Sequence, residues 1–112
     1  MKPFRPIQCK PCEQIGQVLS QQTINAWIKS HPHWSYTGST LKCDITFENY
    51  FETMAVVNAI AFIAHQENHH PDMHVSYNHL VIELKTHSLN GITENDLFLA
   101  EKIQSTLHGD DV

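Results

Sequence analysis

Residues 65–87 read HQENHHPDMHVSYNHLVIELKTH and carry six of the chain's nine histidines. Apolar and polar residues alternate on both sides of Asn78-His79, which predicts the end of a helix followed by a β-hairpin with half-buried strands. Setting the apolar residues opposite one another gives the pairs Tyr77/Leu80, Val75/Ile82, Met73/Leu84, His74/Glu83, Asp72/Lys85 and, further out, His70/His87. Opposed Cβ atoms lie about 4.5–5.5 Å apart, so the last pair of imidazoles could share one small ligand. Because Asn-His is not ideal turn chemistry, a slip of two residues stays open, and it would leave these rings diagonal neighbours.

The other elements follow on both sides of this hairpin. Ser20 is the expected N-cap of a helix that ends at His31-Pro32, and the alternation from Trp34 to Phe47 predicts a first hairpin. A long helix is expected from about Asn49 to about Asn68, and a last helix starts at Thr93. The order helix, hairpin, helix, hairpin, helix predicts an α+β domain, with a four-stranded antiparallel sheet and three helices packed on its apolar face.

Length and composition narrow the class of protein. A chain of 112 residues makes one domain, and we expect a loosely ordered arm at residues 1–19 and a single domain at residues 20–112. The formal charge of -5 and the lack of a basic cluster exclude nucleic acid as a direct partner. No apolar run reaches the roughly 20 residues of a membrane span, and no secretion signal is visible. Three cysteines make no disulfide framework, so the expected location is the cytoplasm.

The arm contains Cys9-Lys10-Pro11-Cys12, a CxxC motif. It could be half of a zinc site, a redox pair or two incidental cysteines. A zinc site needs a second pair of ligands at similar spacing, and a redox pair needs a strand before it and a helix that begins at it. The sequence offers neither context, which favours two incidental cysteines.

The long helix is apolar on nearly every side from Met54 to Ala64, apart from Asn58. A helix that covers one face of a sheet needs only one apolar stripe, and a domain of this size has only one sheet to cover. We therefore expect the surplus apolar face to meet another subunit in a homo-oligomer.

Metal binding is one chemistry that the histidines allow. His65 and His69 are four residues apart on the expected helix, so both would project from the same face. HxxxH can hold zinc, but Gln66 stands where the zinc-protease motif HExxH has its glutamate. No set of ligands converges without assuming a fold, so no metal ligand is assigned.

Acid–base catalysis is the other chemistry, because the free imidazole has a pKa of about 6.5 and can donate and accept protons near neutrality. Pro71 disfavours helical backbone at His70. We therefore expect His69, in the last helical turn, and His70, in the loop, to point in different directions. With His87 from the facing strand, three rings would surround one polar pocket at the rim of the sheet.

Two further residues have structural explanations of their own. Asp96 stands three residues after Thr93, where a capping box places its acid. Trp34 suits a hydrophobic core.

Four short motifs occur in one order and spacing: Asn68-His69-His70-Pro71, Tyr77-Asn78, Thr86-His87, and Gly91-Ile92-Thr93 with Asp96. Together they resemble the pterin-4a-carbinolamine dehydratase family, over the range from Trp34 to Leu107. The resemblance implies three helices on a four-stranded antiparallel sheet, in dimers or tetramers that form through sheet edges and the middle helix.

The reaction implied by this resemblance is the loss of water from a 4a-hydroxytetrahydropterin, which gives the quinonoid dihydropterin and recycles the cofactor of aromatic amino-acid hydroxylases. The three family histidines fall on His69, His70 and His87, with His70 and His87 at the C4a hydroxyl and His69 as the second acid or base. The residues expected to bind the pterin are Asn68, Pro71, Trp34, Thr86, Ser88 and Asp96. Asp96 would also orient a histidine. No metal or organic cofactor is required.

The chain departs from the family pattern in two places, and the resemblance leaves a competing function open. Many members have an acid four residues before the first histidine, where this chain has His65, and the CxxC arm lies outside the family core. Some members also serve as dimerisation cofactors for transcription factors, and some relatives act as assembly helpers. A non-catalytic binding module is therefore the main alternative, followed by a His-rich metal-binding domain.

Overall fold

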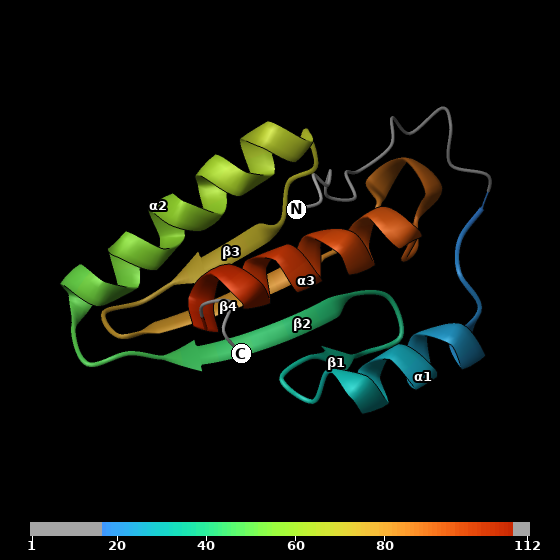
Figure 1. Ribbon diagram of the computed structural model, residues 1–112, viewed down its shortest axis with the longest axis horizontal. Helices are drawn as coiled ribbons and strands as arrows, with labels where there is room; N and C mark the ends of the chain where they lie inside the picture. Colours follow the sequence, from blue (N-terminus) through green and yellow to red (C-terminus); the bar gives the residue numbers. More distant parts are fainter. Residues whose placement is uncertain (1–16, 109–112) are drawn as a thin grey trace, which may run out of the picture.

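The computed structural model describes residues 17–108, and Figure 1 shows their arrangement. It confirms the predicted α+β fold of three helices and a four-stranded antiparallel sheet. The elements are α1 (Gln21–Ser30), β1 (Ser35–Tyr36), β2 (Leu41–Thr46), α2 (Tyr50–Glu67), β3 (Asp72–Val75), β4 (His79–Leu84), a short 3₁₀ helix η2 (His87–Leu89), and α3 (Glu94–His108). The CxxC motif lies outside the described residues. Within residues 17–108, no helix is long and apolar enough to cross a membrane.

The two hairpins meet through their long strands, because the strand order is β1-β2-β4-β3. Alternate residues of β2 and β4 are buried on one face, among them Leu41 opposite Leu84 and Cys43 opposite Ile82. In Figure 1, α3 crosses over these central strands, while α2 lies on the β3 side and α1 on the β1 side. The three helices therefore share one apolar core with one face of the sheet, as the pattern predicts.

Both ends of α2 follow from its two asparagines. The side chain of Asn49 accepts a hydrogen bond from the Glu52 N–H at 2.9 Å, which caps the first turn. Asn68 adopts the left-handed conformation (φ 53°, ψ 40°), and the His69 N–H donates to the carbonyl of Ala64 at 3.2 Å. These contacts end the helix at Glu67. The prediction that His69 lies in the last helical turn is therefore wrong, and so is the premise that an HxxxH pair shares one helical face.

The second hairpin differs from its predicted register by two residues. Met73 lies opposite Ile82 and Val75 opposite Leu80, around a turn formed by Tyr77-Asn78. The pairs predicted around an Asn78-His79 turn are wrong, including His70 opposite His87.

The hydrophobic pattern repeats every two residues, so it fits both registers equally well. Contacts from elsewhere in the chain hold the turn. The Phe47 N–H donates to the Asn78 carbonyl at 2.7 Å, and the Thr53 hydroxyl lies 3.0 Å from the Tyr77 carbonyl. These two contacts select the observed register.

Candidate active site

The segment between β4 and α3 folds back on itself and brings two motifs together. Thr86 and Gly91 form an isolated antiparallel bridge, with 2.8 Å between the Thr86 nitrogen and the Gly91 oxygen. The loop between them contains η2 and closes at Asn90, which is left-handed (φ 55°). A side chain at Gly91 would displace Val18, because an added Cβ would lie 2.6 Å from Val18 Cγ1. The bridge places Thr86 beside Thr93, at the start of α3.

Asp96 is the buried carboxylate that joins these elements, and its exposed fraction is 0%. Its Oδ2 accepts hydrogen bonds from the Thr86 hydroxyl at 2.7 Å and from the Thr93 N–H at 2.9 Å. Its Oδ1 lies 2.7 Å from His69 Nε2. The contact with Thr93 is the predicted helix cap. The contact with His69 agrees with the expectation from the family resemblance that Asp96 orients a histidine.

These contacts determine which nitrogen of His69 carries a proton. Asp96 Oδ2 accepts from two donors at the N-terminus of α3, the Thr86 hydroxyl and the Thr93 N–H. An ionised carboxylate only accepts hydrogen bonds, so His69 donates from Nε2. In the neutral ring, Nδ1 is then the nitrogen with a free lone pair.

His70 and His87 are both exposed. His87 begins η2, and its Nε2 is 3.9 Å from Asp72 Oδ2, with exposed fractions of 67% and 61% for the two side chains. This is a weak attraction between exposed groups. Asp72 directly follows His70-Pro71, so the contact brings His87 beside the segment that carries the other two histidines. His87 directly follows Thr86 in the sequence, so the exposed histidine is joined to the buried group of Thr86, Thr93 and Asp96.

Asn68 and Ser88 are also exposed, and Pro71 is half-buried. They are available to line a substrate. Thr86 has an exposed fraction of 1%, and its hydroxyl is directed at Asp96. Thr86 therefore lies beneath the surface, whereas His70 and His87 lie on it.

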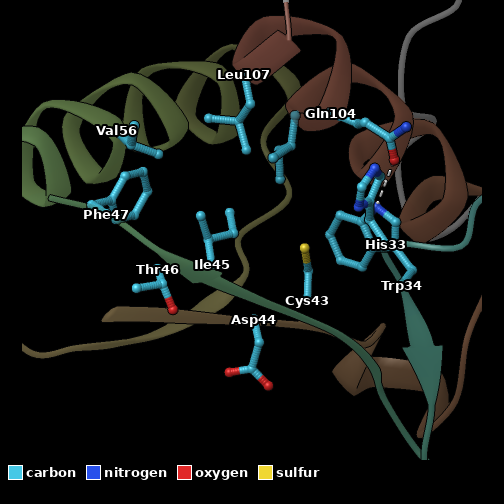
Figure 2. A pocket seen from close by; sticks show the side chains of 11 residues that line it. His33, Trp34, Cys43, Asp44, Ile45, Thr46, Phe47, Val56, Gln104 and Leu107 are labelled. Atoms are coloured by element: carbon cyan, nitrogen blue, oxygen red, sulfur yellow. Dashed lines mark hydrogen bonds between the residues drawn. The ribbon is translucent and has the colours of Figure 1, made fainter. Parts of the chain in front are cut away.

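Trp34 lies in another part of the fold. Its indole N–H donates to Gln104 Oε1 at 3.1 Å, as Figure 2 shows. It lines a cavity of about 350 Å³ together with His33, Cys43, Asp44, Ile45, Thr46, Phe47, Val56, Ile103, Gln104 and Leu107. Asp96 and Gln104 are eight residues apart on α3, about 12 Å along its axis. The structure thus does not bring Trp34 to the three histidines, and it supports the alternative that Trp34 is a core residue.

Other histidines lie on the face of the sheet away from the helices. His79 Nε2 is 2.9 Å from Asp44 Oδ1, and His74 Nε2 is 3.7 Å from Glu83 Oε1. The part of the chain that the structure describes contains no group of three or more histidine, cysteine, aspartate or glutamate side chains that could hold a metal ion.

Residues 17–106 match the family model described as Pterin 4 alpha carbinolamine dehydratase. This chain belongs to that family. A pterin-4-alpha-carbinolamine dehydratase homologue from Nitrosospira multiformis is 45% identical over 98 residues, which cover 88% of this chain and 87% of the homologue. Another, from Legionella pneumophila (strain Corby), is 45% identical over 102 residues, which cover 88% of this chain and 90% of the homologue.

Two solved structures share the fold of this pterin-4a-carbinolamine dehydratase family member. A transcriptional coactivator/pterin dehydratase from Brucella melitensis aligns with a TM-score of 0.75 at 24% identity, over 80% of this chain and 97% of that chain. A pterin dehydratase-like protein identified as a RuBisCO assembly factor in the alpha-carboxysome aligns with a TM-score of 0.53 at 19% identity, over 64% of this chain and 83% of that chain.

Sequence reasoning missed two residues of this family member's site. The Thr93 side chain lies 2.7 Å from the Thr86 hydroxyl, although the sequence marked Thr93 as the start of a helix and a member of a family motif without assigning it to the site. Asp72 contacts His87, although the predicted register paired it with Lys85. The capping-box spacing was the available signal for Thr93. No local pattern indicated Asp72, because its contact depends on the register of the hairpin.

Proposed function

We propose that this protein dehydrates 4a-hydroxytetrahydropterin to the quinonoid dihydropterin by acid–base catalysis with His69, His70 and His87. The observation that supports this most directly is the buried pair of His69 and Asp96, 2.7 Å apart, in a member of the pterin-4a-carbinolamine dehydratase family. A buried carboxylate that accepts a hydrogen bond from the Nε2–H group fixes the tautomer of a histidine and leaves Nδ1 as a base.

The reaction needs two proton movements. The C4a hydroxyl takes a proton and leaves as water, and the neighbouring ring nitrogen loses its proton so that its electron pair forms the new C=N bond. We assign the second step to His69 Nδ1, and the delivery of a proton to the hydroxyl to His70 and His87. Acid–base help of this kind contributes about 10²–10⁴-fold in rate. In the cell, the product would return to the cofactor pool of aromatic amino-acid hydroxylases.

The pterin would lie against the exposed surface between His70 and His87. Asn68, Pro71 and Ser88 would line it, because they flank the histidines in the sequence and are at least partly exposed. Asp96 would orient His69 and would not touch the substrate, since it is fully buried.

The same protein would work as a dimer or tetramer that forms through the outer face of α2. Phe51, Ala55, Asn58 and Phe62 share that face and are exposed, with fractions of 81% for Phe51 and 63% for Phe62. Two exposed phenylalanines on one helical face are typical of an interaction surface. The sequence indicated a surplus apolar face between Met54 and Ala64, and Ala55 and Phe62 of this surface lie within that stretch.

The test is the rate of 4a-hydroxytetrahydropterin dehydration with purified protein. The wild type should accelerate the reaction by at least about 100-fold over buffer. His87→Ala should lose most of that acceleration while its melting temperature stays close to that of the wild type, because His87 is exposed. An equal rate for the wild type and buffer would reject the catalytic function.

The same exposed face of α2 supports the second candidate, a binding module that docks a partner protein. The pterin dehydratase-like protein identified as a RuBisCO assembly factor has this fold. A wild-type rate at the buffer background, together with a stable complex that Phe62→Glu abolishes, would favour this candidate.

A further inference from the structure

Buried hydroxyl groups form a chain that ends on the carboxylate of Asp96. The Thr86 Oγ1 lies 2.7 Å from Asp96 Oδ2 and 2.7 Å from Thr93 Oγ1. Thr93 Oγ1 is in turn 3.3 Å from the Asn95 nitrogen. The exposed fractions of these four residues are 1% or less, so bulk water has no access to the chain.

The direction of each hydrogen bond follows from counting protons. The Thr86 hydroxyl has one proton, and Asp96 Oδ2 can only accept, so that proton points to Asp96. The Thr93 hydroxyl must then donate to Thr86, and its oxygen accepts from the Asn95 N–H. The donors of these hydrogen bonds therefore all point in one direction, from the first turn of α3 to Asp96, and each hydrogen bond polarises the next.

This chain holds one oxygen of Asp96 and thereby aims the other. Oδ2 is fixed by two donors, the Thr86 hydroxyl and the Thr93 N–H. With Oδ2 fixed, Oδ1 faces His69 Nε2 at 2.7 Å. Removal of the Thr86 hydroxyl would leave Oδ2 with the backbone donor alone and the carboxylate freer to rotate.

We propose that Thr86 and Thr93 are positioning residues, which act on His69 through Asp96, and that the Thr86 hydroxyl does not bind substrate. The catalytic part of this inference rests on the proposed function. It replaces the role as a pterin-binding residue that the family resemblance implied for Thr86.

Thr86→Val tests the proposal, because valine has the shape of threonine without the hydroxyl, and Thr86→Ser is the matched control that keeps the hydroxyl. The first measurement is the NMR signal of the His69 Nε2 proton in the substrate-free protein, assigned by its loss in His69→Gln. We expect a slowly exchanging signal in the wild type and in Thr86→Ser. In Thr86→Val this proton should exchange with water at least about tenfold faster, as expected for the loss of one hydrogen bond to a charged group.

The second measurement separates positioning from substrate binding. We expect Thr86→Val to lower kcat on the order of tenfold and to leave KM within about twofold, while Thr86→Ser restores kcat. A rise in KM with unchanged kcat would show that Thr86 contacts the substrate, and it would overturn the proposal.

Thr86→Val leaves the Thr93 hydroxyl without its acceptor, which costs stability. If this variant does not fold, Thr86→Val/Thr93→Val is the second variant, because it also removes the Thr93 hydroxyl that Thr86→Val leaves without an acceptor, at the cost of the acceptor of the Asn95 N–H. An unchanged Nε2 proton in the folded variant would overturn the proposal whether or not the protein is a dehydratase. Absence of dehydratase activity in the wild type would reject the proposed function, and the NMR comparison would still decide the positioning role.

Discussion

Replacing Asp96 by asparagine should reverse the tautomer of His69. The Thr93 N–H is a fixed backbone donor 2.9 Å from Oδ2, and the Thr86 hydroxyl is on the same side. The amide oxygen of the introduced asparagine must stay there, which turns its NH₂ group towards His69 Nε2. That nitrogen must then accept a hydrogen bond, so the ring proton moves to Nδ1. The ring loses the lone pair that we assign to proton removal.

The size of the effect follows from the contacts that change. Three hydrogen bonds to a buried carboxylate contribute about 1.5–3 kcal/mol each, and neutral ones about 0.5–1.5 kcal/mol, so Asp96→Asn should cost roughly 3–4.5 kcal/mol. For a domain of this size, that lowers the melting temperature by roughly 10–20 °C. The loss of a general base at His69 should lower kcat at least about 100-fold. In serine proteases, the corresponding aspartate-to-asparagine change lowers kcat about 10⁴-fold through the wrong tautomer.

Long-range ¹⁵N–¹H NMR of the imidazole reads the tautomer directly, in parallel with the dehydratase assay. The matched control is Asp44→Asn, because Asp44 Oδ1 lies 2.9 Å from His79 Nε2 in an exposed pair on the other face of the sheet. The control should cost less than about 1 kcal/mol and leave kcat unchanged. If folded Asp96→Asn keeps the proton of His69 on Nε2 and retains wild-type kcat, the reasoning is refuted.

Two other predictions concern the α2 face and the buried thiol. Phe62→Glu should convert the oligomer to monomers in analytical ultracentrifugation, whereas Ser105→Glu, on the exposed side of α3, should not; a wild type that sediments as a monomer would contradict the proposed assembly. Burial, and secondarily the charge of Asp44, raises the pKa of Cys43 from 9.0 to about 11, so the thiol should resist alkylation at pH 8 until the protein unfolds. Because its folded pKa lies above the unfolded value, its contribution to stability is complete below pH 9 and is lost as the pH rises towards 11. Peptide mapping that found Cys43 labelled in the native protein as fast as a free thiol would contradict this assignment.

Local patterns predicted most of the fold, because helix caps and the alternation of half-buried strands depend on residues that are close together in the sequence. The Ser20 oxygen accepts from the Thr23 N–H at 3.1 Å, as its N-cap position required. The expected limits of α2, Asn49 and Asn68, are its two caps. No such local pattern determined the register of the second hairpin. It depends on contacts of the Tyr77-Asn78 turn with Phe47 and Thr53, which lie 24 to 31 residues away along the chain.

The candidate site was predictable in part for the same reason. The family motifs indicated the histidines and Asp96, and the structure joins Asp96 to His69. The environment of a side chain was harder to predict. Thr86 belongs to a motif, yet its hydroxyl is directed into the core, and Trp34 packs beside Gln104, about 12 Å along α3 from Asp96. Motif membership does not reveal which way a side chain faces, since that depends on packing between distant segments.

The most direct test compares the initial rate of 4a-hydroxytetrahydropterin dehydration with wild-type protein, with His69→Ala and with buffer alone. We predict that the wild type exceeds buffer by at least about 100-fold, and that folded His69→Ala loses most of this acceleration. A wild-type rate equal to that of buffer, or a His69→Ala rate equal to that of the wild type, would contradict the claim that the histidine held by Asp96 is the catalytic base.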